Sequence, residues 1–325
     1  MAEEVTIVIP FYNAGQYIEH AIDSVLKQTY PHWHLILVND GSTDQSVMKI
    51  EHYLATPRIT LIQNPRNMGQ SFSLNKALEQ VQTPFFTQLD GDDWFFPHTV
   101  EVLVKEAQKP DHQVAVLGGN AMVYVEDDSG IRKMTYLRKG IPYTNKYDFL
   151  LSNLSLWPRF YRTETVKSIG GWPDDGPDQG RMLEDKRMLY TLLTHNYTIH
   201  WLDQTLYNYR RHGRNLTNNI QMYGEAYEWL IRKTLKDWGN QYQPVFITYG
   251  RGWKKVAQLL PISSQPQAAP AQQTQSQTTQ SEPPPHKTPQ NKSRQSQGIG
   301  TGPYTGPGTA PGTGPGTGPG TGPGT

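Results

Sequence analysis

Three carboxylates within four residues follow an apolar segment in the first half of the chain. Residues 85–94 read Phe-Phe-Thr-Gln-Leu-Asp-Gly-Asp-Asp-Trp, so Asp90, Asp92 and Asp93 come at the end of a predicted strand. Like charges this close repel one another, and Mg²⁺ typically compensates them through one or two carboxylates plus substrate phosphates. The same residues also fit an Asp/Gly turn that caps the next helix. Taken locally, the segment predicts a metal–diphosphate site and a simple turn about equally.

Alternating strand and helix signals surround this acidic segment. Continuous apolar runs predict strands, and the segments between them carry apolar residues at helical spacing. The predicted strands are 5–9, 35–38, 59–62, 85–89 and 114–117, and the predicted helices are 15–27, 43–54, 71–81 and 97–108. Repeated β-α-β-α units predict a mainly parallel, doubly wound α/β sheet. Sheets of this kind bind ligands beyond the carboxyl ends of their strands.

The second half of the chain has a less regular pattern. The predicted elements are a hairpin at 121–137, a strand leading into a short helix at 160–169, a helix at 183–194, short strands at 199–202 and 205–209, and an amphipathic helix at 222–237. We therefore divide the folded part into a first half, 1–118, and a second half with C-terminal helices, 119–260.

Composition separates the remaining residues from this folded part. Residues 261–325 are rich in Gln, Pro and Ser and then repeat Gly-Pro-Gly-Thr. They bury too little apolar surface to fold, and the repeat lacks the glycine at every third residue that collagen requires. A disordered linker and tail are expected there.

Charge and cysteine content exclude several classes of protein. The 325 residues include 30 Lys and Arg against 29 Asp and Glu, which gives no basis for binding nucleic acid. The absence of cysteine excludes disulfides, Cys-ligated zinc and thiol catalysis. There is no secretory signal at the N-terminus, and no apolar stretch approaches the ~20 residues that cross a bilayer. We expect a cytoplasmic protein without a transmembrane segment, with peripheral association to a membrane or a surface matrix left open.

Polar, turn-forming residues follow each of the first four predicted strands. These segments are Pro10-Phe11-Tyr12-Asn13, Asn39-Asp40-Gly41-Ser42, Asn64 to Gly69, and Asp90-Gly91-Asp92-Asp93. The first contains no Gly-x-Gly-x-x-Gly, and the chain has no P-loop motif, which disfavours dinucleotide-binding and P-loop folds. A nucleoside diphosphate at this edge would therefore be held through a metal rather than a glycine cradle.

These segments, in this order and spacing, resemble family-2 glycosyltransferases with the GT-A fold. The resemblance covers about residues 4–215 and extends to the spore-coat polysaccharide and the capsule and cell-wall glycosyltransferases. It implies metal-assisted, inverting transfer of a sugar from a nucleotide-diphospho-sugar, with UDP favoured, in polysaccharide or glycoconjugate biosynthesis. It also implies that residues 1–118 are the nucleotide-sugar-binding half and residues 119–260 the acceptor-binding half. The implied cofactor is Mn²⁺ or Mg²⁺, and the implied acceptor is a saccharide, a lipid-linked molecule or a protein.

The resemblance also implies roles for individual residues at the donor side. The nucleotide would contact Pro10, Phe11, Tyr12, Asp40, Asn67, Gly69 and Asp90. Asp92 would be the direct metal ligand, supported by Asp93, and His212 would bind the metal or a phosphate. Arg210 and Arg211, in the same Tyr207–Gly213 segment, would grip the diphosphate, since a guanidinium can bind phosphate bidentately.

The acceptor side is marked by Gly170-Gly171-Trp172 followed by Glu184-Asp185, which resembles the Gly-Gly…Glu-Asp pattern of the family. An inverting transfer needs a base for the acceptor hydroxyl, and this pattern implies Asp185, with Glu184 as the alternative. Both acids also fit a helix N-terminus, where the dipole favours negative charge. Residues expected to line the acceptor sugar site are Trp157, Arg159 and Trp172.

Two other functions compete with this interpretation. Sugar-phosphate nucleotidyltransferases share a related fold, but they open with a Gly-rich, Arg-containing loop where this chain has Phe-Tyr-Asn-Ala-Gly. A non-catalytic protein could also retain the fold for binding. The presence of Asp90, Asp92, Asp185 and His212 together argues against loss of catalysis.

Overall fold

The computed structural model describes residues 3–109, 114–127, 129–140, 142–215, 218–250 and 252–262. The predicted disordered tail, 261–325, lies outside these residues apart from its first two positions. Elements of the first half are β1 (Val5–Phe11), α1 (Ile18–Leu26), β2 (Trp33–Asn39), α2 (Ser46–Ile50), the 3-10 helix η1 (Glu51–Ala55), β3 (Ile59–Gln63), α3 (Gln70–Gln80), β4 (Phe85–Gln88), β5 (Trp94–Phe95) and α4 (Thr99–Ala107).

The long strand β6 (Val114–Glu126) spans the predicted boundary between residues 118 and 119, so both halves contribute to one sheet. The elements of the second half are β6, β7 (Arg132–Arg138), α5 (Lys146–Ser152), β8 (Trp157–Arg162), α6 (Thr163–Ser168), α7 (Glu184–Thr194), β9 (Thr198–Arg211), α8 (Ile220–Asp237), β10 (Tyr242–Tyr249) and β11 (Trp253–Pro261).

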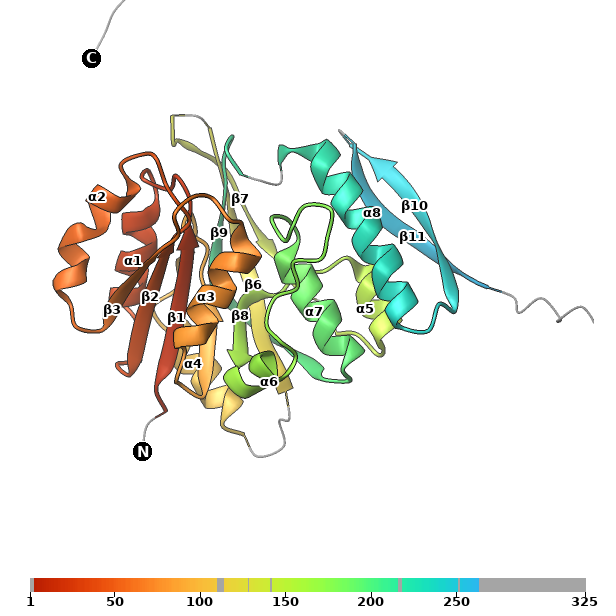
Figure 1. The fold of residues 1–325 in the computed structure, drawn as a ribbon, viewed down its shortest axis with the longest axis horizontal. Coiled ribbons are helices and arrows are strands. Elements are labelled where there is room, and N and C mark those ends of the chain that lie inside the picture. The colour runs from red at the N-terminus through yellow and green to blue at the C-terminus, as the bar shows by residue number, and fades with distance from the viewer. Residues whose placement is uncertain are drawn as a thin grey trace, which may run out of the picture. The chain divides into compact units, whose positions relative to one another are not determined.

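Nine of the described strands form one mixed sheet in the order β3-β2-β1-β4-β8-β6-β9-β5, with β7 paired to β6 (Figure 1). Strands β3, β2, β1 and β4 are parallel, and β6 is parallel to β9, whereas β8 is antiparallel to both β4 and β6. The predicted doubly wound α/β fold is therefore confirmed. Because β1 to β4 are parallel, the loops that follow them share one edge of the sheet.

Alternate side chains of the central strands enter two separate cores. Ile7 and Ile9 of β1 pack with α1 and α4 on one face, while Val8 packs with α3, α7 and α8 on the other. Successive side chains of a strand point to opposite faces, so a strand covered on both sides must be apolar at nearly every position. This explains why β1 is buried along its whole length.

Two predictions about local structure were wrong. The two short strands expected at 199–202 and 205–209 are one continuous strand, β9. Its exposed residues Asp203 and Gln204 suggested a loop, but the chain stays extended and absorbs the irregularity as a register shift opposite Gly118–Asn120 of β6. The second half was expected to end in helices, but α8 is followed by the antiparallel hairpin β10–β11, whose Val256 is buried in the core that also contains α8.

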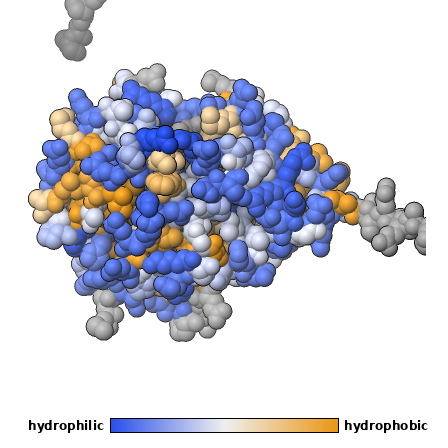
Figure 2. Space-filling model, viewed as in Figure 1, coloured by the Kyte–Doolittle hydropathy of each residue, from blue (hydrophilic) through white to orange (hydrophobic). Residues whose placement is uncertain are grey.

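Helix α2 is also shorter than predicted, because residues 51–55 continue as a 3-10 helix. Among the described residues, no helix combines the length and apolar character that a bilayer span requires. The face shown in Figure 2 is mostly hydrophilic, with apolar residues concentrated over the side where α1 and α2 lie.

Candidate active site

Asp40, at the end of β2, organises the loop that follows β3. Its carboxylate accepts hydrogen bonds from Asn64 Nδ2 (2.8 Å) and from the backbone N–H groups of Met68 (2.8 Å) and Gly69 (2.9 Å). Asp40 is only 5% exposed. The structure thus brings Asp40 and Gly69 together, and both oxygens of Asp40 hold the loop that also carries Asn67.

The turn after Asp40 passes very close to this same loop. Gly41 has a φ of +72°, and a Cβ at this position would lie 2.6 Å from Cα of Arg66. Only glycine combines this backbone conformation with so close an approach. The glycine of the Asp40-Gly41 pair therefore allows the two loops to meet.

The end of β1 packs against the acidic segment. A Cβ on Gly91 would lie 3.0 Å from Cβ of Phe11, so the turn at Gly91 contacts the β1 strand directly. Pro10 and Phe11 are buried, whereas Tyr12 is 47% exposed. Of these three predicted nucleotide contacts, Tyr12 is the one whose ring is accessible to a base.

The Asp90 carboxylate is held by three side chains from different elements. Oδ1 accepts from Gln88 Nε2 (3.0 Å) and Gln70 Nε2 (3.1 Å), and Oδ2 accepts from Arg159 Nη2 (3.4 Å). Gln70 opens α3 and Arg159 lies on β8. Asp90 therefore connects the loop after β3 to the acceptor half.

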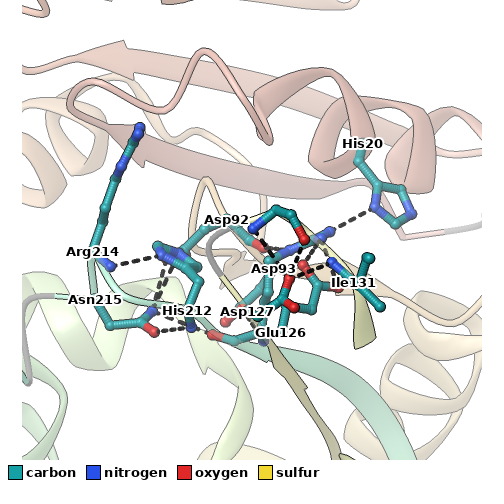
Figure 3. Close-up of polar contacts among 11 residues, drawn as sticks. His20, Asp92, Asp93, Glu126, Asp127, Ile131, His212, Arg214 and Asn215 are labelled. Carbon is teal, nitrogen blue, oxygen red and sulfur yellow. Dashed lines mark hydrogen bonds and ion pairs between the residues drawn. The ribbon is translucent and has the colours of Figure 1, made fainter. Parts of the chain in front are cut away.

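Asp92 forms a cluster with His212 and Asn215, which lie just beyond β9. Asp92 Oδ2 accepts from His212 Nε2 and from Asn215 Nδ2, each at 3.1 Å. Figure 3 shows these three side chains pointing toward one another, while the Arg214 side chain extends away. His212 is stacked on the ring of Tyr17, with centroids 4.5 Å apart. The backbone N–H of Arg214 donates to His212 Nδ1 (3.1 Å), so in the neutral imidazole the proton is on Nε2.

These donor atoms fit a divalent cation that is shared with a diphosphate. The Asp92 carboxylate suits Mn²⁺ or Mg²⁺, and its side chain is 28% exposed, which leaves room for another ligand. His212 Nε2 would join it with the imidazole proton on Nδ1, in place of the contact from the Arg214 backbone. In the part of the chain that the structure describes, no three His, Asp or Glu side chains form a complete cation site. Most of the coordination would therefore come from phosphate oxygens and water, as is usual for Mg²⁺ at nucleotide sites.

Asp93 and Arg210 hold the acidic turn in place. Asp93 is 1% exposed, and its Oδ1 accepts from the backbone N–H of Arg210 (2.7 Å). Burial and then the charges of Asp92 and Asp90 raise the pKa of Asp93 well above its ordinary value. Arg210 donates through Nε to the Asp92 carbonyl (2.8 Å) and through Nη1 to Glu126 (2.8 Å).

The three arginines near this turn differ in exposure. Arg210 is 8% exposed, with its guanidinium over the rings of Tyr17 and Trp94, each 4.7 Å from the centroid. Arg211 and Arg214 are exposed. Arg210 is thus occupied within the protein, and the other two present their charges to solvent.

Glu184 and Asp185, the two candidate bases, open α7 as expected but occupy different environments. Glu184 is 8% exposed, and burial, followed by the charge of Asp185, raises its pKa to about 8. The Asp185 side chain is 18% exposed, and its Oδ2 accepts from Arg159 Nη1 (3.5 Å). A carboxyl group that stays protonated at neutral pH cannot accept a proton, so this arrangement favours Asp185 over Glu184 as the base.

The predicted acceptor residues Trp157 and Trp172 are both buried in the cores. Trp157 is 8% exposed, stacks on Tyr209 (6.1 Å between centroids) and lies beneath the guanidinium of Arg138 (4.7 Å). Trp172 is 2% exposed and packs edge-on against Phe86 and Tyr161. The structure therefore places Trp172 in the core, away from any surface that an acceptor could reach.

Several residues of the site were not predicted from the sequence. They are Tyr17, Gln70, Gln88, Arg214 and Asn215. Arg181 also belongs here, because its Nη1 donates to Asn67 Oδ1 (2.6 Å). Asn215 could have been predicted, because it lies only three residues after His212. The other residues reach the site through contacts between distant elements, which the sequence alone does not show.

Comparison with solved structures defines the class of protein to which this fold belongs. S. aureus TarS 1-349 in complex with UDP-GlcNAc aligns with a TM-score of 0.54 and 20% identity, over 72% of this chain and 66% of that one. The mannosyltransferase PcManGT of Pyrobaculum calidifontis, solved with GDP-Man and Mn²⁺, aligns with a TM-score of 0.55 and 16% identity, over 73% and 65%. At this identity the likeness establishes the fold, which is the GT-A fold of glycosyltransferases.

The family follows from the sequence comparison. Residues 6–170 match the model of glycosyl transferase family 2, and the chain belongs to this family. The glycosyltransferase GlyA of Streptococcus pneumoniae serotype 4 is 27% identical over 220 residues, which are 64% of this chain and 30% of GlyA. The chain spans less than half the length of the curated relatives that it matches.

Proposed function

We propose that this protein transfers a sugar from a nucleotide-diphospho-sugar to an acceptor hydroxyl, with inversion at the anomeric carbon. The observation that carries the proposal is the arrangement of two acidic positions around one buried arginine. Asp90 of the donor edge and Asp185 of α7 both contact Arg159, and Asp92 lies two residues from Asp90. A nucleotide site and a candidate base are therefore held in a fixed relation.

The donor would lie over the loops that follow β1, β2 and β3. Tyr12 offers an exposed ring for stacking on the base. Asp40 acts through the loop that it holds, because its oxygens are occupied by Asn64, Met68 and Gly69. The UDP-GlcNAc complex of TarS supports a UDP-sugar, while the GDP-Man complex of PcManGT keeps a GDP-sugar as the alternative.

A divalent cation, Mn²⁺ or Mg²⁺, would be held by Asp92 and His212. When bound, it supplies positive charge that stabilises the departing diphosphate. We assign Asp93 and Arg210 to supporting the turn that carries Asp92, since both are buried and bonded within the protein. Arg211 and Arg214 are the proposed phosphate contacts, because their charges are exposed. The Mn²⁺ in the PcManGT structure supports this cation.

Asp185 would take the proton of the acceptor hydroxyl as its oxygen attacks the anomeric carbon. The new glycosidic C–O bond forms while the bond from the sugar to the diphosphate breaks, and the nucleoside diphosphate leaves. The acceptor class remains a saccharide, a lipid-linked molecule or a protein.

Release of nucleoside diphosphate tests this proposal. The purified protein is incubated with UDP-GlcNAc, UDP-glucose and GDP-mannose, with Mn²⁺ or with EDTA, and the release of UDP or GDP is measured. We expect release from a UDP-sugar that depends on the metal. Failure of every donor, together with absence of UDP binding by calorimetry, would refute the proposal.

A further inference from the structure

We infer that Arg159 is a positioning residue that fixes the orientation of the Asp185 carboxylate, rather than a contact to the acceptor. This inference rests on the proposed function, because it presumes that Asp185 is the base. It concerns a side chain on β8, an element that contributes no other predicted donor-site residue.

The burial of Arg159 excludes direct contact with an acceptor sugar. Its side chain is 3% exposed, and its two terminal nitrogens face two different carboxylates. Nη2 lies 3.4 Å from Asp90 Oδ2, and Nη1 lies 3.5 Å from Asp185 Oδ2. A planar guanidinium can hold two carboxylates at a fixed angle, which the single ammonium of lysine cannot do.

The remaining contacts of both carboxylates make this geometry specific. Asp185 Oδ1 accepts from the backbone N–H of Lys186 (2.7 Å), so one oxygen is fixed by α7 and the other by Arg159. Asp90 Oδ1 is fixed by Gln70 and Gln88. Arg159 is therefore anchored to the donor edge, and that anchor sets where Asp185 points.

Several ionisable groups lie around Asp185, and two of them, Arg159 and Lys186, are cations. The ionisable groups that face Asp185 from the elements packed on it are Arg159 and Tyr161 of β8, Asp90 beyond β4, Tyr223 of α8, and Glu184, Lys186 and Tyr190 of α7 itself. Lys186 donates its ammonium to the carbonyls of Asn153 and Leu154 rather than to Asp185. Among the described residues, Arg159 is thus the cationic residue whose side chain donates a hydrogen bond to the Asp185 carboxylate.

The test compares Arg159→Lys and Arg159→Met with wild type in kcat, in the KM of the donor and in melting temperature. Arg159→Lys keeps a positive charge but cannot hold both carboxylates, so it should lower kcat by about 10–100-fold with little change in the KM of the donor. Arg159→Met removes both contacts and should lower kcat at least as much.

A matched control separates this role from simple structural support. Arg187 on α7 is also 3% exposed and pairs with Asp175, so Arg187→Met should lower the melting temperature without a comparable loss of kcat. Wild-type kcat in a folded Arg159→Met would overturn the inference. If that variant does not fold, wild-type kcat in Arg159→Lys would overturn it. Inactive wild-type protein that binds no UDP would instead refute the proposed function.

Discussion

The three carboxylates of the acidic segment have different partners, and these partners decide what each can do. Asp90 is bonded to two glutamines and Arg159, and Asp93 is buried against the backbone of β9. Asp92 alone of the three combines partial exposure with an imidazole neighbour. The sequence could place all three near a diphosphate, but the distinction among them depends largely on contacts with residues far along the chain.

Glu184 and Asp185 also differ in their surroundings, and this difference gives a prediction for catalysis. Asp185→Asn removes the proposed base while keeping the size of the side chain, so we expect UDP binding within about twofold of wild type and a loss of transfer of about 10²–10⁴-fold. Glu184→Gln, its matched control, should retain most of the activity, because Glu184 is mostly protonated at neutral pH. Calorimetry and UDP release measure the two properties. Transfer at the wild-type rate by Asp185→Asn would exclude it as the base.

At the scale of elements, the loops after β2 and β3 form one unit through Asp40 and the close approach at Gly41. The sequence identified these loops correctly, because the strands before them are continuous apolar runs and parallel strands bring their ends together. It did not identify the hairpin β10–β11, since its residues are mostly exposed or half-buried and show no clear apolar alternation. It split β9 for a related reason, because polarity at Asp203 and Gln204 suggested a loop.

Gly41→Ala tests whether this contact between loops is required. A methyl group there must displace the backbone of Arg66 while alanine adopts a positive φ, and we expect a loss of about 2–4 kcal/mol of stability together with weaker UDP binding. Gly170→Ala is the control, because Gly170 has a φ of +84° but nothing within 4 Å of the position that a methyl group would take. It should cost about 1 kcal/mol and leave UDP binding unchanged. Equal losses in the two variants would show that only backbone strain is involved.

For the whole molecule, the two cores on either side of the sheet explain why fold class was the most predictable property. Periodicity in the sequence reports burial, and burial on both faces defines this fold. The arrangement of charged groups between the two halves follows no period. Arg159 was predicted to line the acceptor site, and the structure instead places it between Asp90 and Asp185.

Burial of charge in this region also predicts how stability depends on pH. The pKa of Glu184 is about 8 in the folded protein and 4.5 ordinarily, so the folded state binds a proton that the unfolded state has lost between those values. The free energy of unfolding should therefore fall as the pH rises from about 5 to 8. Glu184→Gln should reduce this fall, by an amount on the order of 3 kcal/mol, leaving a remainder from Asp90 and Asp93.

Denaturant unfolding at several pH values measures this effect. The exposed Glu164 on α6 provides the control, because Glu164→Gln should preserve the wild-type dependence. An unchanged slope in Glu184→Gln would show that Glu184 is ionised in the folded protein.

Titration of UDP by calorimetry, with and without Mn²⁺, tests most directly whether Asp92 and His212 hold a cation that binds a diphosphate. We predict that Mn²⁺ raises the affinity of the wild-type protein for UDP by at least about tenfold, and that Asp92→Asn abolishes this increase. Asp237→Asn, at the exposed end of α8, should behave as wild type. Equal metal dependence in Asp92→Asn and wild type would contradict the account.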